Sequence, residues 1–155
     1  MIVVAAAVAG AVLGLFEIAN TSIGWHLASG DWILANRAFL YTDPFSFTSG
    51  GANWVDHEWL FQVTVSIAYS LAGPAALVVL RALVGAALTV MLSLVGTRSG
   101  LSPAAALVLS VLCVAGARER FFVRPELATL LIVPASVWLY LRREKFSSPG
   151  WLAGL

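Results

Sequence analysis

The sequence predicts an all-α integral membrane protein with about four transmembrane helices and a structured first extracytoplasmic loop that contains short interfacial helices. Three observations lead to this fold class. Hydrophobic residues make up 60% of the 155-residue chain, and the mean hydropathy is +0.90. Charged residues make up only 11%, whereas soluble domains carry about 25%. Finally, long apolar runs flank one polar, turn-rich and aromatic stretch, YTDPFSFTSGGANWVDHEWLFQ.

A membrane helix needs roughly 17 to 25 mostly apolar residues, and four runs approach that length. We expect spans at about 2–19, 74–95, 101–117 and 126–141. The first run has no basic residue before it and carries Glu17 near its end, so we expect an uncleaved anchor rather than a signal peptide. Arg81 lies within the second run, where a charge is usually paired or functional unless its long stem reaches the interface.

The polar connection over about residues 20–57 is the predicted extracytoplasmic loop. Within it, IGWHLASGDWILANR at 23–37 predicts a short amphipathic helix, and Pro and Gly in DPFSFTSGG predict turns. A further interfacial helix is expected at about 58–71. It carries a polar stripe, repeated every four residues, of Glu58, Gln62, Ser66 and Ser70. The basic residues near the span ends are balanced between the two sides, and the long polar loop favours a cytoplasmic N-terminus in a single membrane domain over 1–155.

Several classes of function are excluded. The net charge of +1 gives no basis for nucleic-acid binding, and the single cysteine, Cys113, cannot form an internal disulfide or a CxxC metal site. HEWLF begins like the zinc-protease motif HExxH, but Phe61 stands where the second His is needed. His26 and His57 with the nearby acids could form an oxygen-rich metal site, although their spacing is not specific. We therefore predict no metal and no cofactor.

The polar stretch supplies the candidate catalytic residues, which are Asp43, Asp56, His57 and Glu58. A carboxylate beside an imidazole at the bilayer edge can act as a general base. Each acid also has a structural interpretation. Asp43 precedes a proline and can cap a turn, and Asp56 precedes a helix and can cap its N-terminus.

A second candidate group is the arginine cluster of RERFFVRPE. Arg118, Arg120 and Arg124 can hold a phosphate, since the planar guanidinium binds two phosphate oxygens and stays charged. The alternative is that they pair with Glu119 and Glu126 at the ends of two spans. The tryptophans of the loop, Trp25, Trp32, Trp54 and Trp59, fit an interfacial belt or the lining of a sugar or lipid site.

The motifs GWHLASGDWIL, TDPFSFT, WVDHEWL, GPAALVVLRAL and FFVRPELATLL, taken in order, resemble the N-terminal part of a group of large bacterial multi-pass membrane proteins. These proteins are similar to the C-type glycosyltransferases, which include dolichyl-phosphate-mannose protein mannosyltransferases and lipid-A aminoarabinose transferases. The resemblance covers about residues 15 to 140. It implies a bacterial inner (plasma) membrane protein with a first outer loop that carries a catalytic acid.

The resemblance also implies the partners: membrane lipid and a lipid-linked sugar donor. An acid often stands two residues before Gly-Trp-His in this family, and here Ser22 occupies that position, so Asp43, Asp56 or Glu58 would have to serve. Family members carry many more spans, so we expect this chain to be the front piece of a longer protein. The alternative function is a non-catalytic membrane scaffold or assembly module. The sequence gives no oligomeric state.

Overall fold

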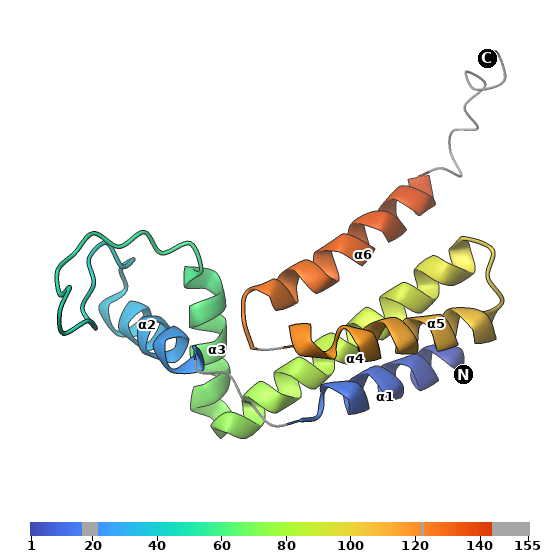
Figure 1. Ribbon diagram of the computed structural model, residues 1–155, viewed down its shortest axis with the longest axis horizontal. Coiled ribbons are helices and arrows are strands. Elements are labelled where there is room, and N and C mark those ends of the chain that lie inside the picture. The colour runs from blue at the N-terminus through green and yellow to red at the C-terminus, as the bar shows by residue number, and fades with distance from the viewer. Residues whose placement is uncertain (17–21, 122, 144–155) are drawn as a thin grey trace, which may run out of the picture. The chain divides into compact units, whose positions relative to one another are not determined.

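The computed structural model describes residues 1–16, 22–121 and 123–143, without the side chains of residues 119 and 143. The fold of this part of the chain is all-α, as predicted (Figure 1). The helices are α1 (Ile2–Gly14), α2 (Ile23–Asn36), α3 (Trp59–Ala72), α4 (Pro74–Arg98), α5 (Pro103–Gly116), the short 3-10 helix η1 (Arg118–Arg120) and α6 (Glu126–Arg143). Within the same residues, the extended backbone pairing is one isolated antiparallel bridge between Thr42 and Asn53.

Glycine, proline and serine residues lie at the ends of several helices and explain why the helices begin or end there. Gly73, at φ 61°, ends α3, and Pro74 begins α4 because the first turn of a helix needs no amide hydrogen. Ser102 caps α5, and its hydroxyl accepts a hydrogen bond from the amide of Ala105 at 3.3 Å. The boundary between α3 and α4 therefore falls in the gap between the expected helix at about 58–71 and the expected span at about 74–95.

One helix in the described part of the chain, α4, is long and apolar enough to cross a membrane. It has 25 residues, and the mean hydropathy of its most apolar window is 2.3. The helices in the other predicted spans differ from the expectation. α1 ends at Gly14, five residues before the predicted end, and the remainder of that span falls largely on residues 17–21, outside the described residues. α5 is also short, with 14 residues, and α6 has 18 residues with charges at both ends.

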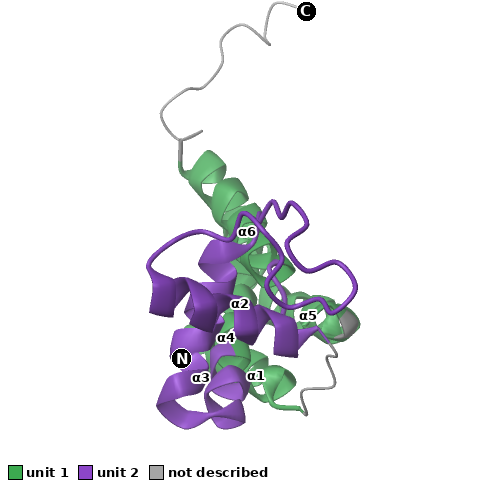
Figure 2. Ribbon diagram, turned by 90° about the vertical axis from the view of Figure 1, so that its left-hand side faces the viewer, with its two compact units in different colours: residues 1–16, 81–121, 126–155 green, residues 17–80, 122–125 purple. Residues whose placement is uncertain are grey.

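The chain divides into two compact units (Figure 2). Unit 1 contains Met1–Phe16, Arg81–Phe121 and Glu126–Leu155, and unit 2 contains Glu17–Leu80 and Phe122–Pro125. The first turns of α4 thus belong to unit 2 and the rest to unit 1. The sequence had predicted a single membrane domain over 1–155.

Unit 1 is packed through small residues. α1 buries Ala6, Gly10 and Gly14, which repeat every four residues, and it exposes Val4 and Val8. A Cβ atom built on Gly10 would lie 2.2 Å from the carbonyl oxygen of Gly85 on α4, so the two backbones are in direct contact. The core of the unit comprises Leu88, Val114, Phe121 and Leu127. Close approach through small residues is characteristic of helix pairs in membranes.

Arg81 is buried in unit 1, with 1% of its surface exposed. Its Nε donates a hydrogen bond of 2.8 Å to the carbonyl oxygen of Gly14, and a terminal nitrogen donates to the carbonyl of Phe16. The guanidinium also stacks 3.7 Å from the centre of the Phe16 ring. Carbonyl groups at a helix end have no partner within the helix, so Arg81 satisfies the end of α1. The buried guanidinium is thus hydrogen-bonded to backbone carbonyls within the unit.

Unit 2 is built on α2 and α3, which lie side by side (Figure 1). These helices occupy nearly the ranges predicted from the sequence. Their facing sides are mostly polar or small: α2 buries His26, Ser29, Gly30 and Ile33, and α3 buries Gln62, Val65 and Ser66. The middle of the predicted polar stripe on α3 therefore faces inward, whereas Ser70, at its end, is exposed.

The outward side of α3 is apolar. Leu60, Ile67 and Leu71 are 63%, 46% and 80% exposed, whereas Gln62 and Ser66 are 0% and 2% exposed. A helix on the surface of a water-soluble protein has the opposite arrangement, with its apolar stripe on the core. On α3 the buried polar residues thus face α2, whereas Leu60, Ile67 and Leu71 face outward. The apolar core of unit 2 is formed by Val65, Leu77 and Val123.

Candidate functional site

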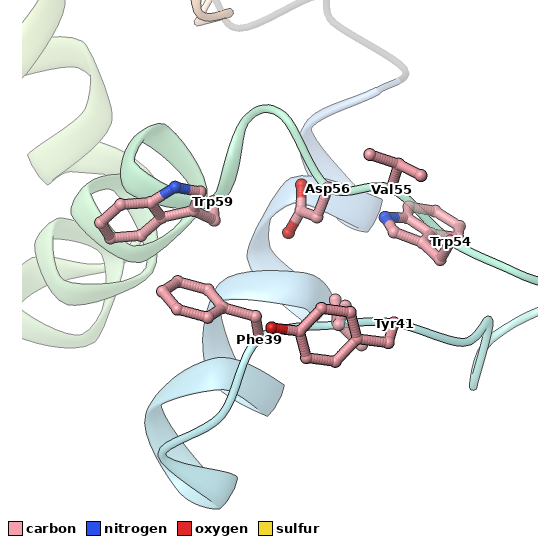
Figure 3. A pocket seen from close by; sticks show the side chains of 7 residues that line it. Phe39, Tyr41, Trp54, Val55, Asp56 and Trp59 are labelled. Carbon is pink, nitrogen blue, oxygen red and sulfur yellow. The ribbon is translucent and has the colours of Figure 1, made fainter.

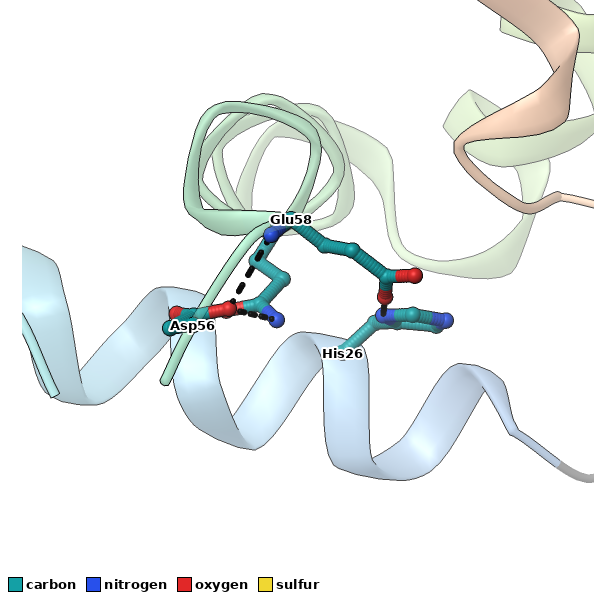
Figure 4. A network of polar contacts seen from close by, with 4 residues as sticks. His26, Asp56 and Glu58 are labelled. Carbon is teal, nitrogen blue, oxygen red and sulfur yellow. Dashed lines mark hydrogen bonds and ion pairs between the residues drawn. The ribbon is translucent and has the colours of Figure 1, made fainter. Parts of the chain in front are cut away.

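The candidate site lies in unit 2, where the segment leading into α3 meets α2. Asp56 organises this segment. Its Oδ1 accepts hydrogen bonds from the amide of Glu58 at 3.2 Å and from the side-chain Nε2 of Gln62 at 2.8 Å (Figure 4). A bond from an Asp side chain to the amide two residues on is an Asx turn. Glu58, rather than Asp56, is the N-cap residue of α3, so Asp56 shapes the entry to the helix from two residues earlier.

Glu58 meets an imidazole at this entry, and the imidazole belongs to His26 on α2. The distance from His26 Nδ1 to Glu58 Oε2 is 3.5 Å, which is within ion-pair range (Figure 4). The side chain of His26 is 3% exposed and that of Glu58 is 38% exposed. The pair therefore has a buried member and a member that can meet molecules arriving from outside.

The His26 ring is held in place by aromatic neighbours. The ring of Trp25 lies 4.1 Å from it, centre to centre, and Phe61 of α3 meets it edge-on at 5.2 Å. Such tilted and edge-to-face contacts fix ring orientation. Five residues further along α2, the carboxylate of Asp31 accepts a hydrogen bond from the hydroxyl of Ser66 on α3. The two helices are thus joined by polar contacts along their shared face.

Asp43 is used locally. Its Oδ1 accepts hydrogen bonds from the amides of Phe45 at 2.8 Å and Ser46 at 3.0 Å, and its own amide donates to the carbonyl of Ala52 at 2.8 Å. The side-chain hydrogen bond with Ser46, followed by the amide of Phe45, lowers the pKa of this carboxyl below its ordinary value. A lowered pKa makes a weaker base. The contacts therefore fit the turn-capping interpretation of Asp43.

The structure brings Asp56 and Glu58 together but gives His57 a different setting. His57 lies between them in the sequence, yet its side chain is exposed. The sequence had suggested that Glu58 would act beside this neighbouring imidazole, and the structure pairs it with His26 instead.

The predicted phosphate-binding arginines fall in different units. Arg118 and Arg120 form η1 of unit 1, where both are exposed and the guanidinium of Arg118 lies 4.8 Å from the centre of the Phe16 ring. Arg124, also exposed, belongs to unit 2. The alternative partner Glu119 has a side chain outside the described residues. Phosphate binding by the three arginines stays a prediction.

Two site residues were not among the predicted catalytic or phosphate-binding residues, namely His26, which had been considered only as a metal ligand, and Gln62. Both were visible in patterns: His26 in the GWH motif and Gln62 in the polar stripe. The missing information was the pairing of α2 with α3. Within the residues that the structure describes, no group of three or more His, Cys, Asp or Glu side chains is placed to hold a metal ion.

Comparison with known proteins identified no relative of this chain. No family model matches the chain, and neither does any curated protein or solved structure.

Proposed function

We propose that this chain is the N-terminal part of a membrane glycosyltransferase-like protein, in which Glu58 is the general base that activates the acceptor. The observation that carries this proposal is the pair formed by buried His26 and half-exposed Glu58. A general base must reach its substrate and must be held in a fixed position. Glu58 reaches the surface, and His26 behind it is a positioning residue.

The reaction is a displacement at the anomeric carbon of a lipid-linked sugar. Glu58 takes the proton of an acceptor hydroxyl or amine, and the acceptor atom forms a bond to the anomeric carbon. The bond from that carbon to the donor phosphate oxygen breaks, and the phosphate leaves with the electron pair. Cationic groups that neutralise a leaving phosphate lower the barrier of such a step. Arg118, Arg120 and Arg124 are the candidates for this role.

A membrane location is supported by where the apolar surface lies. The most apolar window of α4 is 33% buried, whereas the core helix of a soluble protein would be mostly buried. α3 exposes leucine and isoleucine and buries glutamine and serine. On this basis we propose that α1, α4, α5 and α6 mark the four spans and that α2 and α3 lie at the outer interface of a bacterial inner membrane.

A second candidate function is a non-catalytic membrane scaffold or assembly module. The observation that favours it is that two of the candidate acids accept hydrogen bonds from backbone amides. Asp43 caps a turn and Asp56 caps the approach to α3. Asp31, similarly, is bound to Ser66. In this interpretation Glu58 anchors α3 to His26 and touches no substrate.

The two candidates differ in the effect of Glu58→Gln. We would place this change in the complete membrane protein that contains the chain and measure sugar transfer from a polyprenyl-phosphate sugar to acceptor. Loss of a general base lowers the rate by about 10²–10⁴-fold, and the isosteric amide keeps the local packing. Glu126→Gln, at an exposed acid on α6, is the matched control and should transfer at the normal rate.

The scaffold function predicts another result. Glu58→Gln would then leave any transfer unchanged and would instead lower the thermal stability of the chain. Equal rates for Glu58→Gln and the control, with normal membrane insertion, would rule out Glu58 as the base. A further check is the pH profile of transfer, which should shift in His26→Gln because His26 acts through Glu58.

A further inference from the structure

We propose that the aromatic cavity of unit 2 binds a primary ammonium group, held by the carboxylate of Asp56. The cavity has a volume of about 360 Å³, which is at the small end of ligand sites. Its walls include four aromatic side chains, and its acidic residue is Asp56. Those lining residues that carry the argument are Phe39, Tyr41, Trp54, Asp56 and Trp59. Nothing in the glycosyl-transfer proposal depends on this cavity.

The aromatic rings stand around the carboxylate. Figure 3 shows the Asp56 side chain between the indoles of Trp59 and Trp54, with Phe39 and Tyr41 on the other wall. The faces of aromatic rings attract cations, most strongly for Trp. Rings that surround one carboxylate therefore favour a cationic guest over a neutral guest of the same size.

The walls are fixed before any ligand arrives. Phe39 meets Trp59 edge-on at 5.1 Å, and Trp54 meets Trp25 in the same way at 5.8 Å. The amide of Trp54 donates a hydrogen bond of 2.9 Å to the carbonyl of Tyr41, so the segments carrying these two side chains are paired. A site whose walls are already ordered loses less conformational entropy when it binds.

The Asp56 carboxylate has hydrogen-bonding capacity left over. Oδ1 is occupied by the amide of Glu58 and the side chain of Gln62, whereas Oδ2 is buried and accepts no hydrogen bond from the described residues. A buried acceptor without a donor is unfavourable. Asp56 lines the cavity, so Oδ2 is the oxygen of this carboxylate that is left to accept a hydrogen bond from a ligand there.

These features select a primary ammonium. It carries the positive charge that the rings and the carboxylate attract, and its N–H groups satisfy Oδ2. A quaternary ammonium has the charge but no hydrogen to donate. A neutral alcohol has a hydrogen but no charge. The carrier is expected to be partly apolar, since the rest of the lining is aromatic or aliphatic.

The test compares butylamine with butan-1-ol, which are nearly equal in size and differ in charge. The full chain in detergent is titrated with each, and tryptophan fluorescence reports binding because Trp54 and Trp59 line the cavity. We expect butylamine to bind at least tenfold more tightly than butan-1-ol. Equal affinities would overturn the proposal, since ring packing alone would then explain the binding.

The variants separate the carboxylate from the rings. Asp56→Asn keeps an oxygen for the Glu58 amide and Gln62, and it should weaken butylamine binding by about tenfold or more while leaving butan-1-ol unaffected. Trp59→Leu removes one wall and should weaken butylamine binding by about threefold. Glu126→Gln, an equal change of charge on α6, should have no effect. Unchanged butylamine affinity in both Asp56→Asn and Trp59→Leu would refute the site.

The source of the ammonium is identified in a second arm. The full chain is placed in nanodiscs of phosphatidylethanolamine or of phosphatidylcholine, which are both zwitterionic but differ in having or lacking N–H donors, and butylamine is titrated again. Weaker apparent binding in the phosphatidylethanolamine discs means that the lipid headgroup occupies the cavity and supports a membrane source. Equal binding in both means that the ammonium ligand comes from solution. Absence of saturable binding in detergent and in both discs would overturn the proposal.

Discussion

Gly30→Ala is the most direct test of the α2–α3 pairing that forms the candidate site. A Cβ at Gly30 would lie 2.2 Å from the carbonyl oxygen of Gln62 and 2.7 Å from Cβ of Ser66. Ordinary contacts begin at 3.4 Å, so the two helices would have to separate locally by about 1 Å in an interior that is otherwise close-packed. The obstructing oxygen belongs to backbone, and no side-chain rotation relieves the contact.

The size of the effect follows from two opposing terms. Overpacking of this kind destabilises by about 1–3 kcal/mol. Alanine is also a better helix former than glycine by about 0.5–1 kcal/mol, which offsets part of the loss. We expect a net loss of about 1–2 kcal/mol, together with a longer distance between His26 and Glu58 on the neighbouring turn.

Gly24→Ala is the matched control. Gly24 lies on the same helix, and a Cβ there would meet nothing within 4 Å, so this change should be neutral or stabilise by about 0.5–1 kcal/mol. Denaturant unfolding of the purified chain in detergent, followed by circular dichroism, gives both values. If the two variants unfold at the same midpoint, α2 and α3 do not approach as closely as the structure indicates, and the site geometry fails with them.

Three further predictions concern other parts of the chain. The pKa of Asp43 is lowered by its hydrogen bonds, so its contribution to stability is complete above the ordinary value of 3.8 and is lost as the pH falls through the lower folded value. Asp43→Asn should remove this part of the acid dependence of the unfolding midpoint. Arg81→Met removes the side-chain donor of the Gly14 and Phe16 carbonyls and should destabilise by about 2–3 kcal/mol, measured by the same unfolding assay. Ser49→Cys should react with a membrane-impermeant thiol reagent added from the extracytoplasmic side, and reaction only from the cytoplasmic side would contradict the proposed topology.

Local patterns in the sequence predicted most of the helices. The expected helix at 23–37 is α2 (Ile23–Asn36), and that at about 58–71 is α3 (Trp59–Ala72). Periodicity, Gly and Pro determine such segments, because they act over a few neighbouring residues. The end of α1 was less predictable. The apolar run continues past Gly14, and the helix ends where Arg81, 67 residues away, donates to the Gly14 carbonyl.

The site was predictable only in part, for the same reason. Glu58 and Asp56 were recognised as acids at a helix start, and that position follows from sequence alone. The partner of Glu58 did not follow. His57 is adjacent in the chain but exposed, whereas His26 is 32 residues earlier and reaches Glu58 through the packing of α2 on α3. The faces through which two helices pack depend on both helices together. The periodicity of one helix alone does not specify them.

The residues of α3 that contact α2 are different from the residues of α3 that face outward. Ser66 donates a hydrogen bond to Asp31 of α2, and the backbone carbonyl of Gln62 lies against Gly30 of α2. Leu60, Ile67 and Leu71 face outward. The outward positions can therefore be substituted without changing the contacts between α2 and α3. A version of α3 with Lys or Gln at these three positions would present a water-compatible surface around an unchanged site. One set of residues on α3 therefore supports the site, and another set determines whether the surface of the helix suits lipid or water.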